Sequence, residues 1–170
     1  MKEIQLTQGK VALVDDEDYE RVNQFKWYAQ KHGNGTFRAV RNETLRSRKD
    51  ARETGLPIHK TILMHRFILN VPDSMDIDHV NHNTLDNQKD NLRICTHSQN
   101  TMNQLLQGGT SSKYKGVCWN KQRKKWIVYI KCEGKRTNLG YFTDELEATK
   151  AYNAKAGDLH GEFAYLNPVK

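Results

Sequence analysis

Cysteine and proline are both scarce in this 170-residue sequence, which contains three of each. The three cysteines, Cys95, Cys118 and Cys132, are odd in number, lie far apart in the chain and form no CxxC pair. Disulfide frameworks need paired cysteines, and cysteine-based zinc sites use closely spaced ones. We therefore expect neither a disulfide framework nor a structural zinc site.

Long hydrophobic runs are also missing. No stretch approaches the roughly 18 apolar residues of a membrane-spanning helix, and the first ten residues, MKEIQLTQGK, lack the apolar stretch of a secretory signal. Hydrophobic residues make up 36% of the chain and charged residues 28%, which allows a core of modest size. We expect a soluble cytoplasmic protein with no membrane partner.

Positive charge is concentrated in the C-terminal part of the chain. Residues 1–100 carry 15 Lys and Arg against 14 Asp and Glu, whereas residues 101–170 carry 12 against 6. Between Lys113 and Arg136, nine basic residues and four tryptophans or tyrosines accompany a single acid, Glu133. Such a segment favours a polyanion partner, because phosphates attract the cations and release counterions. On charge alone, a solubilising surface explains the pattern equally well.

The sequence QGGTSS at residues 107–112 predicts a linker, because Gly and Ser disfavour the interiors of helices and strands. It separates an N-terminal module, residues 1–106, from a C-terminal module, residues 113–167. In the N-terminal module the residue patterns predict strands at residues 2–6 and 11–14, followed by a short helix that begins with the acids at 15–18 and runs to about 24. They also predict a hairpin formed by residues 26–30 and 37–41, and a surface loop at residues 46–55.

The candidate catalytic segment follows. The apolar residues 56–71 predict a strand that enters a short helix, and residues 77–80 and 91–94 predict two strands joined by a polar loop. Thr96 and Gln99 fit the capping box S/T-x-x-E/Q, so a helix should run from about residue 97 to 106. The local order is strand, loop, strand, helix.

Asp78-His79, Asn91 and Asn100 are spaced along these elements in a way that resembles the ββα-metal fold of HNH endonucleases. More narrowly, residues 60–103 resemble the phage and intron homing branch, in which the last His of the name is replaced by Asn. The resemblance implies a site-specific DNA endonuclease of phage or mobile-element origin, with its ββα-metal core at about residues 60–106. It also implies one Mg²⁺ or Mn²⁺ per active site, a double-stranded DNA substrate and nicking of one strand. We expect a monomer, and a dimer stays open.

The chemistry of phosphodiester hydrolysis explains these residue types. A histidine has an unperturbed pKa of about 6.5, so His79 can accept a proton from the attacking water near neutral pH. Asp78 and Asn100 offer hard oxygen ligands that suit Mg²⁺ or Mn²⁺. In the family the middle Asn is structural, so Asn91 is expected to brace the loop after His79.

Two further residues belong to the predicted site with their alternatives open. His65 either contacts the phosphate and orients the site, or is a packed structural histidine. Arg93 either binds the scissile phosphate or extends from its strand into solvent.

A second resemblance covers residues 111–167. The segments SKYKGV, KWIVYI and LGYF, followed by an alanine-rich helix pattern, resemble the Apetala-two (ethylene-response-factor) DNA-binding domain. That resemblance implies a three-stranded antiparallel sheet, which enters the DNA major groove, with one helix packed behind it. Residues 133–135 predict a hairpin turn, and Thr143 is the expected N-cap of the helix. Along the second strand, Trp126, Val128 and Ile130 should face the core, and the alternate residues should face DNA.

Six residues of this module are candidates for DNA contact. Four match basic strand positions of the family, and two have no family match; the set is Lys115, Lys125, Lys131 and Arg136, then Trp119 and Arg123. Cys118 and Asn138 depart from the plant pattern, so the plant recognition sequence does not carry over. The expected fold class is α+β. The alternative function is a sequence-specific DNA-binding regulator with an inactive nuclease fold, and the sheet disfavours an RNA-binding protein.

Overall fold

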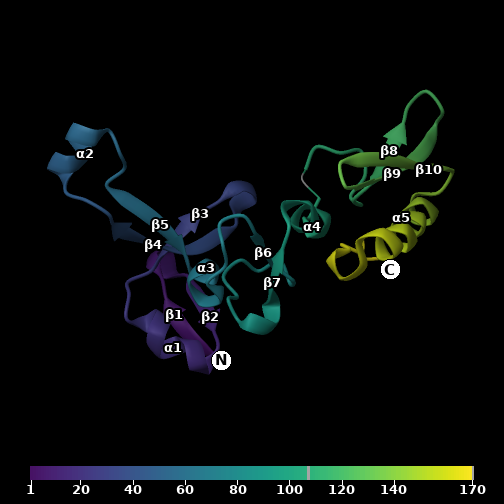
Figure 1. Ribbon diagram of the computed structural model, residues 1–170. Helices are drawn as coiled ribbons and strands as arrows, with labels where there is room; N and C mark the ends of the chain where they lie inside the picture. Colours follow the sequence, from purple (N-terminus) through teal and green to yellow (C-terminus); the bar gives the residue numbers. More distant parts are fainter. Residues whose placement is uncertain (107, 170) are drawn as a thin grey trace. The chain divides into compact units, whose positions relative to one another are not determined.

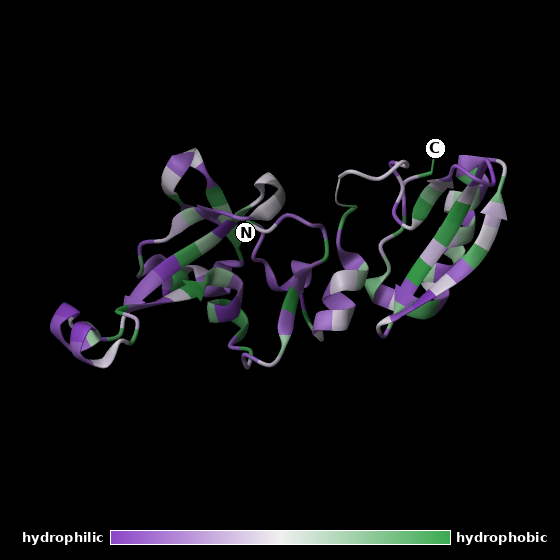
Figure 2. Ribbon diagram, turned by 90° about the horizontal axis from the view of Figure 1, so that it is seen from above, coloured by the Kyte–Doolittle hydropathy of each residue, from purple (hydrophilic) through white to green (hydrophobic). Residues whose placement is uncertain are grey.

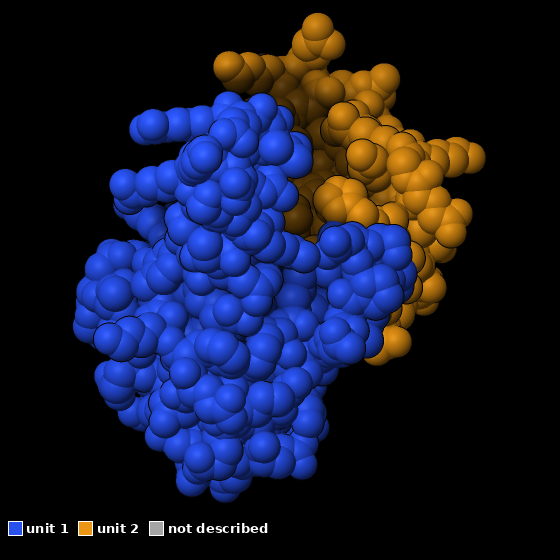
Figure 3. All heavy atoms as spheres, turned by 60° about the vertical axis from the view of Figure 1, so that its left-hand side comes forward, with its two compact units in different colours: residues 1–94 blue, residues 95–170 orange. Residues whose placement is uncertain are grey.

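The computed structural model describes residues 1–106 and 108–169, and it divides into two compact units, residues 1–94 and 95–170 (Figures 1 and 3). The chain mixes helices with several small sheets. The linker predicted at residues 107–112 begins at Gln107, which lies outside the described residues. The units divide between Ile94 and Cys95, which groups the helix predicted at 97–106 with the C-terminal residues.

The first unit opens with a two-stranded antiparallel ladder of β1 (Lys2–Gln5) and β2 (Val11–Val14). Helix α1 (Asp16–Asn23) follows, as the acidic run at its start predicts. Three acids occupy its first turn, where negative charge is favoured by the partial positive charge of the helix N-terminus.

A three-stranded antiparallel sheet of β3 (Tyr28–Lys31), β4 (Phe37–Thr44) and β5 (His59–Leu63) comes next. The prediction of a loop at residues 46–55 is wrong for most of its length, because α2 (Arg48–Thr54) forms there. The signal was present in the sequence. Ser47 and Asp50 form a reciprocal capping box, and Gly55 ends the helix in the left-handed conformation.

The core of the first unit joins its N-terminal elements to α3 (Met64–Leu69), which continues directly from β5. Met64 is fully buried with Val14 and Val22, and Trp27 packs in the same cluster. Residues 1–55 thus build the core that holds the start of α3, and with it His65. Strands β6 (Asp76–His79) and β7 (Leu92–Cys95) then form a two-stranded sheet.

The second unit contains α4 (His97–Asn103), the strands β8 (Val117–Asn120), β9 (Lys125–Cys132) and β10 (Lys135–Phe142), and α5 (Glu145–His160). The three strands form an antiparallel sheet in the order β10-β9-β8. Glu133 and Gly134 make the predicted turn, both with positive φ. Figure 2 shows hydrophobic and hydrophilic residues intermixed along the strands.

Helix α5 packs on this sheet through Ala148, Tyr152 and Ala156, which join Val128 and Ile130 in one core cluster. The expected core face of β9 is therefore confirmed, although Ile127 on the opposite face is also buried. The predicted N-cap is wrong by one residue. Asp144, not Thr143, caps α5, and its carboxylate accepts a hydrogen bond from the backbone N–H of Glu147 at 2.9 Å.

Helix α4 begins where its capping box predicts but ends at Asn103, three residues before the expected 106. At its C-terminal end, the Lys115 ammonium donates hydrogen bonds to the carbonyl oxygens of Met102 and Gln104, both at 2.7 Å, and Thr101, at 3.3 Å. These contacts provide hydrogen-bond donors for carbonyls that have no partner within the helix at its C-terminal end. Within the described residues, no helix is long and apolar enough to cross a membrane.

Candidate active site

Asp78 and His79 are adjacent on β6 and are both buried, with 6% and 7% of their surfaces exposed. Neighbouring residues of a strand point to opposite sides of the sheet, so the two side chains lie in different surroundings. The burial of two adjacent ionisable side chains is costly unless they have polar partners. Their neighbours are therefore informative.

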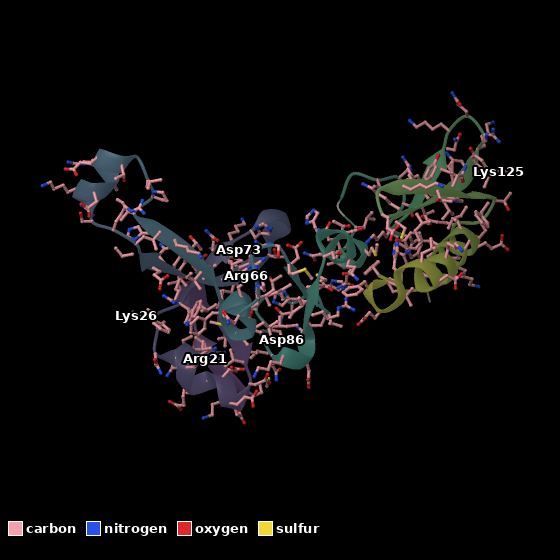
Figure 4. All side chains as sticks on the ribbon, in the orientation of Figure 1. Arg21, Lys26, Arg66, Asp73, Asp86 and Lys125 are labelled. Atoms are coloured by element: carbon pink, nitrogen blue, oxygen red, sulfur yellow. The ribbon has the colours of Figure 1, made fainter. Side chains whose placement is uncertain are left out.

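The loop between β6 and β7 is tied together by Asn91. Its side-chain oxygen accepts a hydrogen bond from the backbone N–H of Asn81 at 2.9 Å, and its side-chain nitrogen donates to the carbonyl of Asp86 at 2.8 Å. Asn81 in turn donates to the Asp86 carboxylate at 2.7 Å. Figure 4 labels Asp86 in this loop. Asn91 thus makes the contacts that a loop brace requires.

The N-terminal strands fix the same loop from outside. The backbone N–H of Leu13 on β2 donates to the Leu85 carbonyl, and the backbone N–H of Asn87 donates to the Leu13 carbonyl, both at 2.8 Å. The Asp15 carboxylate accepts hydrogen bonds from Gln88 and from the backbone N–H of Lys89. Residues at the beginning of the chain therefore hold the loop that follows His79.

His79 lies beside a second buried histidine, His65, from the first turn of α3. The two ring centroids are 5.1 Å apart and the ring planes meet at 82°, an edge-to-face contact. Burial lowers the pKa of His79 below its ordinary value, although Asn87 and the carboxylates of Asp78 and Asp86 act in the opposite direction. Burial, with a smaller contribution from His79, lowers the pKa of His65 to about 3. Both rings are neutral near pH 7, as a proton acceptor must be.

The Asp78 carboxylate is paired with Arg93 from β7. The Arg93 Nε lies 3.2 Å from Asp78 Oδ2, and Nη2 donates to the same oxygen. The Arg93 side chain therefore does not extend freely into solvent. The pair also shows that this buried carboxylate accommodates a cationic partner.

Asn100 lies on α4 in the second unit and is half-buried. The structure groups the other five predicted nuclease residues in the first unit, and the pairing of Asn100 with Asp78 stays a prediction. No cluster of three His, Cys, Asp or Glu side chains suited to a metal occurs in the described part of the chain. The donor chemistry of Asp78 nevertheless fits a divalent cation, since a carboxylate is a hard oxygen ligand and Asn100 would add a neutral amide oxygen. Such an ion would compete with Arg93 for the Asp78 carboxylate.

Sequence reasoning missed three polar residues of this site: Arg38, Asp86 and Asn87. Asp86 and Asn87 lie in the loop and interact electrostatically with His79. Arg38 lies on β4, about forty positions earlier in the chain, and its charge lowers the pKa of both His65 and His79. No spacing rule connects Arg38 to the histidines, so only the fold reveals it. The loop residues could have been suspected from the run of polar side chains between β6 and β7.

The predicted DNA-contact residues of the second unit are mostly exposed on or beside the sheet. The exposed ones are Trp119, Arg123, Lys125, Lys131 and Arg136. Figure 4 labels Lys125, the first residue of β9. Arg136 lies 3.6 Å from the Tyr129 ring centroid, and Trp119 packs edge-on against Trp126 at 5.0 Å.

Lys115 differs from these residues. Its ammonium group is half-buried and binds the last carbonyls of α4, and burial lowers its pKa to about 8. Its three hydrogen-bond donors are thus used inside the unit, which competes with the predicted contact to DNA.

Comparisons with known proteins give one family match and two relatives. The HNH endonuclease family matches residues 70–102, which span β6, the braced loop and most of α4. An HNH endonuclease of Acanthamoeba polyphaga mimivirus is 28% identical over 95% of this chain and 76% of its own length. Protein 3.8 of Escherichia phage T7 is 33% identical over 55% of this chain and 77% of its own length. No solved structure matches the chain.

Proposed function

We propose, from the match of residues 70–102 to the HNH endonuclease family, that this chain is a site-specific, divalent-metal-dependent DNA endonuclease of the homing type. It hydrolyses a phosphodiester of double-stranded DNA and nicks one strand per active site. It acts as a monomer, so a double-strand break requires two centres or two successive nicks.

The observation that carries this proposal is a neutral, buried His79 next to a carboxylate that already binds a cation. His79 accepts the proton as water attacks phosphorus. The bond from phosphorus to the leaving oxygen then breaks, and that oxygen takes a proton from solvent. His65 orients the His79 ring through its edge contact, and Arg93 binds the scissile phosphate from β7.

Asp78 and Asn100 are the proposed ligands of one Mg²⁺ or Mn²⁺. When bound, such an ion supplies Lewis-acid stabilisation of the charge on the phosphate and the leaving oxygen. Asn91 contributes indirectly, because its two hydrogen bonds hold the loop that follows His79.

We propose that the sheet of the second unit binds the target DNA in the manner of the Apetala-two domain. Exposed on its strands are Trp119, Lys125, Lys131 and Arg136, and Arg123 lies in the turn between β8 and β9. Lysines mainly position a protein on phosphates, whereas arginines also read bases through paired hydrogen bonds. Arg123 and Arg136 are therefore the candidates for sequence selectivity.

The direct test incubates a supercoiled plasmid library with the protein and Mg²⁺ or Mn²⁺, beside a His79→Ala variant. Loss of a general base should slow nicking by about 10²–10⁴-fold, with DNA binding retained. Binding without cleavage by the unaltered protein would instead indicate a DNA-binding regulator. Direct conversion of supercoiled to linear DNA by the monomer would contradict nicking as the elementary event.

A further inference from the structure

Arg38 of β4 is a half-buried cation whose hydrogen-bond partner is a histidine. Its Nη2 donates to Nε2 of His32 at 2.8 Å, and no ion pair joins it to a carboxylate among residues 1–106 and 108–169. Four other arginines of the first unit do pair with a carboxylate; they are Arg21, Arg41, Arg66 and Arg93. A guanidinium held by a neutral imidazole keeps its full positive charge, and partial burial makes an uncompensated charge costly.

Two contacts join the strand around Arg38 to the elements that carry the catalytic histidines. Thr84 Oγ1, in the loop after β6, donates a hydrogen bond to the carbonyl of Phe37, the residue before Arg38, at 2.6 Å. The ladder of β4 and β5 pairs Val40 with Leu63, the residue directly before α3, which carries His65 in contact with His79. The charge of Arg38 acts on both rings, as its effect on their pKa values shows.

We infer that Arg38 binds a phosphate group of the DNA next to His79 and is a substrate-binding residue of the nuclease site. This inference rests on the proposed endonuclease function and adds a residue to it. A DNA phosphate provides two oxygen acceptors that match the planar guanidinium fork, and it would form the ion pair that no described carboxylate forms with Arg38.

His32 positions the guanidinium for this contact. Arginine cannot accept a hydrogen bond, so His32 Nε2 is the acceptor and its ring must be unprotonated there. Burial and the Arg38 charge both lower the pKa of His32, which keeps the ring in that state near neutral pH. Because His32 accepts only one donor, the remaining donors of the guanidinium can bind phosphate.

The test compares Arg38→Met with Arg38→Lys and with Arg21→Met in the full chain. Arg21→Met removes the same charge from a carboxylate-paired arginine outside the proposed site, and thermal melting checks that all variants fold. Binding to a short fluorescein-labelled duplex is measured by anisotropy in EDTA at several salt concentrations. Loss of one phosphate contact should reduce the slope of log K against log salt by about 0.9.

We expect Arg38→Met to reduce this slope and to slow plasmid nicking by about 10- to 100-fold, the range for a lost hydrogen bond to a charged group. Arg38→Lys should keep the slope, and Arg21→Met should change neither quantity. If Arg38→Met does not fold, Arg38→Gln replaces it with the same readouts. An unchanged slope and unchanged nicking in folded Arg38→Met overturn the inference, even when His79→Ala abolishes nicking. If His79→Ala still nicks, the proposed function itself fails.

Discussion

Residues 1–94 carry 15 basic and 14 acidic side chains, whereas residues 95–170 carry 12 basic and 6 acidic ones. In the first unit, ionisable and amide side chains are buried around the loop after β6, where Asp78, His79, Asp86, Asn87 and Asn91 all have less than a tenth of their surface exposed. In the second unit, the basic side chains on the sheet are mostly exposed.

The two units therefore use charged side chains in different ways, buried in the first unit and exposed in the second. Burial removes water and alters protonation, as the lowered pKa values of His65 and His79 show, and this suits chemistry at a phosphate. Exposed lysines and arginines remain in contact with water and can exchange counterions for DNA phosphates. The two units should therefore respond differently to metal, pH, mutation and salt.

Metal removal should give the largest contrast. EDTA should abolish nicking, because Asp78 and Asn100 are proposed to act through a divalent ion, while the exposed sheet keeps its affinity for DNA. Plasmid nicking and anisotropy on the same samples measure the two quantities. Asp78→Asn and Asn100→Ala should each raise the Mn²⁺ concentration needed for half-maximal nicking. Full nicking in EDTA would show that the first unit needs no metal.

Acid should destabilise the first unit through His65. Its pKa is about 3 in the fold, against about 6.5 in an unfolded chain. The unfolded state therefore binds the proton first, and stability is lost as pH falls from 6.5 towards 3, by about 1.4 kcal/mol per pH unit. Denaturant unfolding at a series of pH values measures this slope. A His65→Phe control should flatten it, and an equally steep slope in the control would contradict the assignment to His65.

Asn91→Ala should destabilise the loop of the first unit by about 1–3 kcal/mol, the cost of leaving buried polar groups without partners. The groups that lose their partners are the Asn81 N–H and the Asp86 carbonyl. Thermal melting gives the stability, and nicking should fall with it because the loop follows His79. Normal melting together with lost nicking would instead give Asn91 a direct part in catalysis.

The smallest effect should come from single lysines of the second unit. Lys125→Met should weaken DNA binding several-fold and reduce the salt slope by about 0.9, the value for one phosphate contact. Lys115→Met should leave that slope unchanged and lower the melting temperature, because Lys115 binds carbonyls of α4. Anisotropy and melting measure both. An equal loss of slope in the two variants would show that Lys115 contacts DNA, as the sequence predicts.

Local patterns alone determined much of this protein. The Thr96 capping box determines where α4 begins, and the acids at residues 16–18 determine where α1 begins. The spacing of Asp78, His79 and Asn91 indicates an HNH endonuclease. These signals work because they depend on neighbours within a few residues or on a family's fixed spacing. The capping box at Ser47 carries the same kind of signal, yet the polar residues around it predict a loop where α2 forms.

Only the tertiary structure decided which distant side chains meet. It paired Arg93 with Asp78, placed His65 against His79, and brought Arg38 of β4 close enough for its charge to act on both histidines. The tertiary structure also decided the partner of Lys115. The sequence predicts that Lys115 contacts DNA, but its ammonium group binds the carbonyls at the end of α4. Such contacts depend on strand register and on where the core fixes each element. A residue's type and its local spacing do not contain that information.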